Sequence, residues 1–324
     1  AKVAKESGSR IIAIKDEAHY NARHESASTR LLLLVDHSVG DIGVACTATP
    51  DADVLALPGL KHTLRFPYSE AIRLGFCAPY RIVLPSITGV ADGLPVEASE
   101  LASEDQMGAA ALFLVGGMIN DGARRCIAYA RDTKETTIAK GFLERACAFH
   151  GVECSVEIVV QTTKDRQGIY IRFQTKPTYR RTTNAAGDDG FVITLRFLVA
   201  VHILDQCIDL PACDSVGVLS PPTTLSDVKS AHVAIQRLGR ALRPKAMAFL
   251  YIFSSLGNPW LENLFDVLRE YDPGCKRRLA VVDTNPITRF TKESIEVVHT
   301  ELEALVERFH IGSVGAWRPT VNEK

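Results

Sequence analysis

Apolar residues in this chain fall into short runs separated by longer amphipathic stretches. The first two runs, Ile11–Ile14 and Ile42–Cys46, are each bounded by polar residues. Runs of the same kind predict further buried strands at Cys126–Ala130, Cys154–Val160, Phe191–Val201 and Ser215–Leu219. Between them, Thr133–Phe149 has helical spacing. Strands that alternate with helices predict an α/β fold with a parallel sheet, whose ligands bind at the carboxyl ends of the strands.

Composition shifts along the chain predict its domain organisation. Residues 85–105 are rich in Gly, Pro, Ser and acids, which predicts a linker between a first unit at 1–84 and a second at 106–258. We interpret residues 176–190, which are polar and basic, as an inserted loop. Residues 259–324 are expected to form a helical extension, because apolar residues recur there at helical spacing. These residues are Leu261, Leu264, Phe265 and Leu268, then Ile295, Val298, Leu302 and Leu305.

Charge and cysteine usage limit the classes of function. The 37 Lys and Arg residues balance 38 Asp and Glu residues, so any nucleic-acid binding must come from a local basic surface. Composition alone favours an ordinary enzyme with a small-molecule substrate. None of the eight cysteines forms a C-x-x-C pair, which favours buried thiols in an intracellular, reducing compartment.

Asp16-Glu17-Ala18-His19 directly follows the first apolar run. Two carboxylates at the end of a buried strand suit a nucleotide site, because an Asp can hold Mg²⁺ and a Glu can orient or deprotonate an attacking water. A solvated acidic strand end or a helix N-cap would also explain them. Thr47-Ala48-Thr49-Pro50 ends the second run in the same way, and its hydroxyls can hydrogen-bond locally.

A basic segment near residue 240 has the most specific spacing in the chain. It reads Gln236-Arg237-Leu238-Gly239-Arg240-Ala241-Leu242-Arg243. On a helix, Gln236, Arg240 and Arg243 share one face, and Gly239 permits close approach of another backbone. Arginine matches phosphate oxygens bidentately, so two of them on one face suit phosphoryl transfer. A solvated basic face is the alternative, although a mid-helix Gly then costs about 1 kcal/mol for no structural gain.

In this order, the three segments resemble motifs II, III and VI of superfamily 2 helicases, and nearly the whole chain can be placed on that family. Tyr68–Ile82 resembles the segment that closes the first motor domain in one branch. That branch contains type III restriction subunits, XPB-like repair helicases and helicases of large DNA viruses. The ending G-R-A-L-R also favours this branch over DEAH RNA helicases, which read G-R-x-G-R.

Residues 201–216 resemble motif V of the family. Leu204, Asp209, Pro211 and Asp214-Ser215 match it, whereas Gln206 stands where Glu is usual and Cys207 where Gly is usual. The Cys removes the option of positive φ. A loop carboxylate that caps a turn would also explain Asp209.

The resemblance implies two RecA-like parallel-sheet domains of the P-loop NTPase fold, the first one incomplete, with a short helical C-terminal extension. It implies that Asp16 holds Mg²⁺, that Glu17 is the general base, and that His19, Thr47 and Thr49 couple the ATP site to nucleic acid. Asp209 and Gly239 would face ATP, and Gln236, Arg240 and Arg243 would complete the catalytic site. The backbone near Cys207 would touch nucleic-acid phosphates.

Two further positions are weaker candidates for contact with nucleic acid. Arg180 and Arg181, beside Tyr179, suit a single strand by charge and stacking, although a solvated loop explains them equally well. Asp132 follows a predicted strand and resembles the position of motif IV.

A phosphate-binding loop, G-x-x-x-x-G-K-[ST], does not occur in the 324 residues. In P-loop ATPases this loop precedes the Mg²⁺-binding Asp, so we expect the chain to be a fragment of an ATP-dependent DNA helicase or translocase. The alternative is a non-catalytic, helicase-like module that binds nucleic acid or protein. The sequence upstream of residue 1 distinguishes the two hypotheses.

Overall fold

The computed structural model describes residues 12–15, 42–45, 66–86, 106–183, 189–201, 209–220, 228–254, 259–283 and 313–316. Grouped by their contacts, the residues form two units, Ala1–Phe66 and Pro67–Lys324. In the first unit, strands β1 (Ile12–Lys15) and β2 (Ile42–Ala45) pair in parallel, as the two first apolar runs predict.

The second unit is built on one mostly parallel sheet. Its strands are β3 (Tyr80–Ser86), β4 (Arg125–Tyr129), β5 (Glu153–Val159), β6 (Tyr179–Thr183), β7 (Asp189–Ala200), β8 (Ser215–Val218), β9 (Ala248–Ile252), β10 (Leu279–Asp283) and β11 (Ser313–Ala316). They lie in the order β11-β10-β3-β9-β8-β4-β7-β5, and β6 pairs with β7. Every pair is parallel except the antiparallel pair β6–β7.

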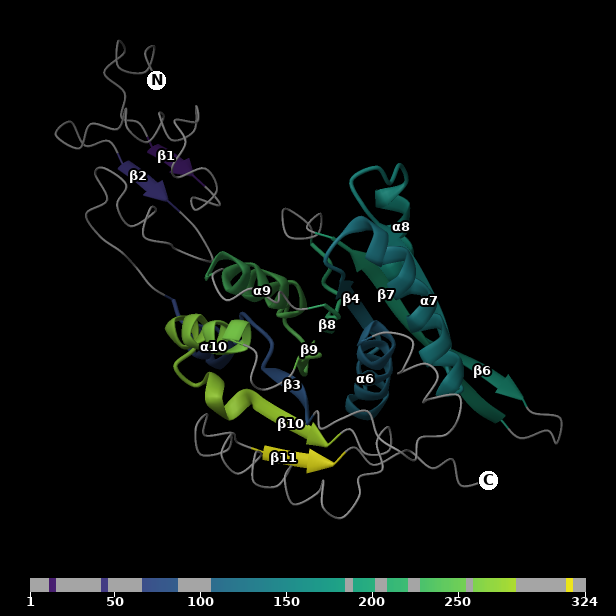
Figure 1. Cartoon of the computed structure of the whole chain (residues 1–324). Coiled ribbons are helices and arrows are strands. Elements are labelled where there is room, and N and C mark those ends of the chain that lie inside the picture. Colours follow the sequence, from purple (N-terminus) through teal and green to yellow (C-terminus); the bar gives the residue numbers. More distant parts are fainter. Residues whose placement is uncertain are drawn as a thin grey trace, which may run out of the picture. The chain divides into compact units, whose positions relative to one another are not determined.

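Helices cover both faces of this sheet (Figure 1). The described helices are α4 (Tyr68–Arg73), α6 (Gln106–Asp121), α7 (Thr133–Phe149), α8 (Arg166–Thr175), α9 (Val228–Ala241) and α10 (Pro259–Tyr271), with a 3₁₀ helix η2 (Cys275–Arg278). Buried residues of α8, α9 and α10 form one core with one face of the strands. Residues of α6 and α7 form a second core on the other face.

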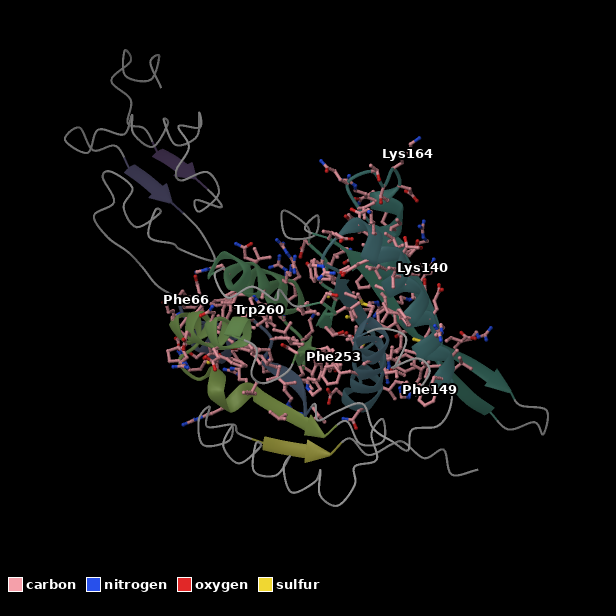
Figure 2. All side chains as sticks on the ribbon, in the orientation of Figure 1. Phe66, Lys140, Phe149, Lys164, Phe253 and Trp260 are labelled. Carbon is pink, nitrogen blue, oxygen red and sulfur yellow. The ribbon has the colours of Figure 1, made fainter. Side chains whose placement is uncertain are left out.

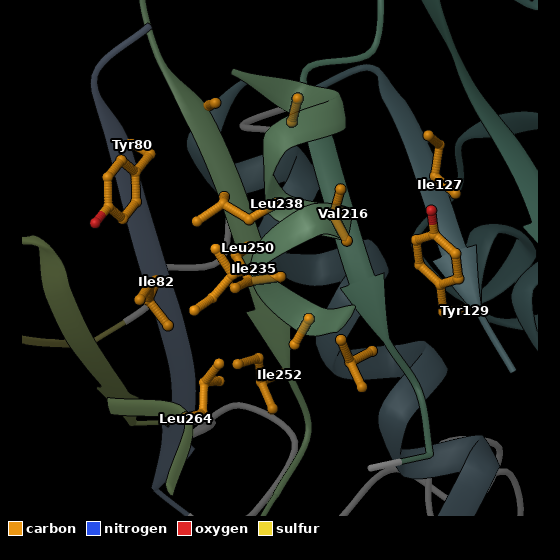
Figure 3. Close-up of a cluster of buried hydrophobic side chains, with 14 of the residues drawn as sticks. Tyr80, Ile82, Ile127, Tyr129, Val216, Ile235, Leu238, Leu250, Ile252 and Leu264 are labelled. Atoms are coloured by element: carbon orange, nitrogen blue, oxygen red, sulfur yellow. The ribbon is translucent and has the colours of Figure 1, made fainter. Parts of the chain in front are cut away.

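Alternation along the strands creates these two cores. Ile82 belongs to the core under α9 and α10, whereas its neighbour Val83 belongs to the core under α6 and α7. In Figure 3, Ile235 and Leu238 of α9 lie over Leu250 of β9. A strand buried on both faces needs a continuous apolar sequence, which explains why the apolar runs predicted the strands so directly.

The division between the units lies earlier than the expected linker at 85–105. Strand β3 hydrogen-bonds to β9 on one side and β10 on the other, so the residues up to Ser86 are an internal part of the second unit. The resemblance assigned this segment to the end of the first domain. The sequence at this point shows only a short helix, a Gly and an apolar strand, and it cannot show which sheet the strand joins.

Two other segments differ from the sequence predictions. The expected loop at 176–190 contains strand β6, which pairs with the start of β7 from Tyr179↔Ile193 to Thr183↔Asp189. The expected helical extension begins with α10, as the first apolar stripe predicts, but β10 and β11 then return to the sheet. The second stripe, at 295–305, lies outside the described residues.

Buried Asp272 fastens the end of α10 to strand β3. Its carboxylate, which is 0% exposed, accepts hydrogen bonds from the Tyr80 hydroxyl at 2.8 Å, Arg278 Nε at 2.6 Å and the Gly274 amide at 2.9 Å. The Arg278 guanidinium also lies 4.8 Å from the centre of the Tyr80 ring. A fully buried carboxylate is tolerated here because a cation and two further donors satisfy it.

Candidate functional site

Helix α9 positions most of the basic segment. Its buried side chains recur at helical spacing, at Ala231, Ala234, Ile235, Leu238 and Ala241, and they pack against the sheet. Between these positions, the residues of the candidate site are half-buried, on the side away from the core. The apolar stripe therefore fixes the rotation of the helix and presents the polar residues outward.

Gln236, Gly239 and Arg240 share a helical face, but Arg243 does not extend it. Helix α9 ends at Ala241, and the amide of Leu242 bonds to the carbonyl of Gly239 at 3.3 Å. The Leu242 carbonyl then accepts from the amide of Ala78 at 2.9 Å, which ties the helix end to the segment before β3. Arg243 is thus presented by the turn that follows the helix rather than by the helix itself.

Arg243 is held by Asp209, which precedes strand β8. The Arg243 Nε donates to Asp209 Oδ1 at 2.7 Å, and the two side chains are 52% and 65% exposed. Among the described residues this is the one hydrogen-bond partner recorded for the Arg243 guanidinium, and it engages Nε rather than the two Nη nitrogens. The two Nη nitrogens make no hydrogen bond or ion pair with a described residue. An ion pair this exposed contributes about 0–1 kcal/mol to stability, so its effect is mainly on orientation.

The segment that carries Asp209 is braced by a lysine that the sequence analysis did not single out. Lys245 Nζ donates to the carbonyl of Pro211 at 3.0 Å and also to the carbonyl of Cys213. Partial burial lowers the pKa of Lys245. Because Lys245 follows Arg243 by two residues, its side chain keeps the Asp209 segment beside the end of α9. A single Lys before a strand carries no signal of this role.

Asp214 of the motif V resemblance has a structural role. Its carboxylate accepts from the amides of Arg124 at 2.8 Å and Arg125 at 2.9 Å, and from the Ser215 hydroxyl at 3.2 Å. Burial raises the pKa of Asp214, while these hydrogen bonds act in the opposite direction. The residue fixes the starts of β4 and β8 relative to each other.

No atom of the described part of the chain crowds the position of Gly239. A Cβ atom built at this position would meet no described atom within 4 Å. Close approach of a described backbone segment, the reason that the sequence analysis suggested for a glycine here, is therefore not observed. Arg237, which the sequence analysis passed over, lies with its guanidinium 4.1 Å from the centre of the Tyr129 ring, where it packs α9 against β4.

The two weaker candidates have local partners. Asp132 is the N-cap of α7 and accepts from the amides of Lys134 at 2.8 Å and Glu135 at 2.9 Å. Arg180 Nη2 donates to Glu153 at 2.7 Å, beside the start of β7. The strand runs eight residues from Val192, the partner of Arg180, to Ala200, which is about 26 Å. Arg180 therefore lies far from residue 201, where the motif V resemblance begins.

Several predicted site residues lie outside the described residues: Asp16, Glu17, His19, Thr47, Thr49 and Cys207, together with the side chain of Arg181. The strands before the first five are described, and β1 and β2 pair in register from Ile12↔Ile42 to Lys15↔Ala45. Within the described ranges no group of three or more His, Cys, Asp or Glu side chains is placed to hold a metal ion. None of the described helices has the length and hydropathy needed to cross a membrane.

No family model matches the chain, and a search of curated proteins gave no significant match. Among solved structures, the chain resembles the ATP-dependent Type ISP restriction-modification enzyme LlaBIII bound to DNA. The TM-score is 0.62 and the identity 17%, over 96% of this chain and 24% of that chain. It also resembles a fragment assigned as an HsdR subunit of a type I restriction enzyme from Vibrio vulnificus YJ016. There the TM-score is 0.52 and the identity 18%, over 84% of this chain and 48% of that chain.

Likeness at these identities shows the fold alone. The chain spans about a quarter of one of these proteins and about half of the other. The parallel sheet, its two helical layers and the match to LlaBIII confirm the predicted α/β class, and the fold of the chain is RecA-like.

Proposed function

We propose that the chain is part of the motor of an ATP-dependent DNA helicase or translocase, in which ATP is hydrolysed between two RecA-like domains. The observation that carries the proposal is the Asp209–Arg243 pair at the end of α9. A carboxylate that holds the Nε of an arginine orients its planar fork and leaves both Nη nitrogens for a phosphate. Asp209 belongs to the segment that resembles motif V, and Arg243 belongs to the segment that resembles motif VI.

In this mechanism, Arg243 and Arg240 stabilise charge on the transferring phosphoryl group. Such arginines typically contribute about three to five orders of magnitude to the rate of phosphoryl transfer. Gln236 lies four residues before Arg240 on α9 and would contact the attacking water or the γ-phosphate. Glu17 would accept the proton of that water, and His19, Thr47 and Thr49 would transmit the nucleotide state to the nucleic acid.

In this proposal Asp16 would hold Mg²⁺ at the nucleotide phosphates. Asp209 and Gly239 would face the ATP. The described donors fit an anionic ligand, since Arg240 and Arg243 are cations near an open backbone at Gly239. They do not form a metal centre by themselves. Bound Mg²⁺ would neutralise phosphate charge, while the residues of this chain orient the phosphates and the water.

We further propose that nucleic acid, preferably DNA, contacts the segment around Cys207, which follows the carboxyl end of β7. Arg180 and Arg181 lie on β6, at the other end of β7, and they would form a separate contact. Because the formal net charge is −1, binding must depend on a few local phosphate contacts.

The alternative is a non-catalytic, helicase-like binding module. Its support is the absence of G-x-x-x-x-G-K-[ST] from the 324 residues. Such a module would bind nucleic acid or protein but would not need the orientation of Arg243 by Asp209.

The test compares Asp209→Asn with Asp266→Asn in a longer form of the protein that carries a phosphate-binding loop upstream. Asp266 is a matched control, since it is also 65% exposed and pairs with an arginine, Arg269, at 2.9 Å. ATP turnover should fall in Asp209→Asn and remain unchanged in Asp266→Asn, with and without single-stranded DNA. Equal turnover in both variants contradicts the proposed role of the pair. Absence of turnover from the parent, with nucleic-acid binding retained, favours the binding module.

A further inference from the structure

The end of helix α7 brings two cysteines together. The amide of Val152 donates to the carbonyl of Cys147 at 3.0 Å, and the amide of Gly151 donates to the carbonyl of Ala148 at 3.0 Å. Gly151 has φ 65°, in the left-handed region. These are the features of a Schellman motif, which reverses the chain at a helix end with little freedom. Cys154, two residues later, is therefore placed beside Cys147.

The thiols of Cys147 and Cys154 lie close enough for each to change the acidity of the other. Cys147 is completely buried in the core under α7, and Cys154, the second residue of β5, packs against the same core while remaining half-buried. In Figure 2, Phe149 marks this end of α7 and Lys140 lies further along the helix. Cys154 is thus the partly exposed member of the pair, and Cys147 is the buried one.

The two thiols differ in acidity. The neighbouring Cys147 lowers the pKa of Cys154, partial burial and Glu144 raise it, and Lys140 lowers it. The neighbouring Cys154 and burial raise the pKa of Cys147. Cys154 is therefore the more acidic thiol of the pair, and the thiolate is the form that reacts with peroxides.

We propose that Cys147 and Cys154 are a redox pair that hydrogen peroxide converts to a disulfide. The Cys154 thiolate attacks one peroxide oxygen, which gives a sulfenic acid and, after protonation, one water. The sulfur of Cys147 then attacks the sulfenic sulfur, loses its proton and releases a second water. Two thiols and one peroxide thus give one disulfide and two waters. A thiol reductant reverses the reaction by exchange.

A second cysteine pair in the described part of the chain provides an internal control. Cys126 and Cys213 lie within electrostatic range of each other, and both are 0% exposed. Burial raises the pKa of both thiols, and Cys213 Sγ donates to the carbonyl of Ser215 at 3.2 Å. These two thiols are close together, but peroxide cannot reach them and their raised pKa keeps them protonated. This pair should therefore stay reduced.

The test treats the full chain with hydrogen peroxide, removes the peroxide, unfolds the chain in denaturant, blocks the remaining thiols and maps the peptides by mass spectrometry. Both cysteines lie between Arg145 and Lys164, so one tryptic peptide, 146–164, contains them, and cleavage after Glu153 separates them. We expect this peptide to lose two hydrogen atoms and to resist blocking. After cleavage at Glu153 its halves should stay joined until dithiothreitol is added, while Cys126 and Cys213 remain blockable.

Two variants identify the order of events. Cys147→Ser should trap Cys154 as a sulfenic acid that reacts with dimedone, and Cys154→Ser should leave Cys147 as an unmodified thiol. The proposal is overturned if Cys147 in the unsubstituted protein stays blockable after peroxide, or if Cys126 and Cys213 oxidise at the same rate as Cys147 and Cys154. Mapping of the unsubstituted protein decides the matter even if a variant fails to fold.

Discussion

Replacing Gly239 with Ala separates a structural role of this glycine from a functional one. A glycine in a helix costs about 0.5–1 kcal/mol relative to alanine. The new Cβ would meet no described atom within 4 Å, so no steric penalty from the described residues offsets this gain. Gly239→Ala should therefore stabilise the chain by up to about 1 kcal/mol, which raises Tm by about 2–4 °C in a domain of this size.

The same substitution should impair function if ATP or another part of the motor approaches α9 at this point. Gly141 of α7 is a matched control, because it also lies in a helix interior and a Cβ there also meets nothing within 4 Å. Both variants should raise Tm in a thermal unfolding assay on this chain. In a longer form with a phosphate-binding loop, only Gly239→Ala should reduce ATP turnover.

Three outcomes would refute this reasoning. A lower Tm for Gly239→Ala alone would show that the position is crowded. An equal loss of turnover in both variants would indicate a general effect of helix stabilisation. Full turnover in both would show that nothing approaches the helix at Gly239 during the catalytic cycle.

Three further predictions concern stability and binding. Asp272→Ala should destabilise the chain by about 3–5 kcal/mol, because it leaves the Arg278 cation, which is only 21% exposed, and the buried Tyr80 hydroxyl without their acceptor, whereas Asp266→Ala at an exposed pair should cost at most about 1 kcal/mol. Denaturant titration measures both, and equal losses would contradict the account. Burial lowers the pKa of His150 from its ordinary 6.5, so the folded state binds fewer protons and stability should fall as pH decreases below that value. His150→Gln should flatten this slope, and an unchanged pH profile would show that another group titrates. Binding of single-stranded DNA should be weak and steeply salt-dependent, and tight binding that barely responds to salt in an anisotropy titration would indicate base-specific recognition instead.

The sequence predicted the parts of the fold that depend on local pattern. Strands buried on both faces require continuous apolar runs, so β4, β8 and the longer part of β7 were visible directly, and the mostly apolar edge strand β5 was visible as well. The membership of β3 was not visible, because its partners β9 and β10 lie far along the chain. Strand β6 was hidden for a similar reason, since its polar and basic residues read as a loop.

The sequence indicated which residues form the candidate site, but not how they are arranged. Helical spacing placed Gln236, Gly239 and Arg240 together, but it also placed Arg243 on a helix that ends at Ala241. The pairing of Arg243 with Asp209 and the bracing by Lys245 are tertiary contacts. No periodicity within one segment encodes contacts of this kind.

The central claim is that Arg240 and Arg243 complete an ATP site, and ATP turnover of their alanine variants tests it most directly. In a longer form with a phosphate-binding loop, each variant should lose turnover by about three orders of magnitude or more while nucleotide binding persists. Lysine should not restore turnover, since it lacks the planar fork. Arg269→Ala, on the exposed side of α10, is the control and should be unaffected. Near-normal turnover in Arg240→Lys or Arg243→Ala would contradict the account.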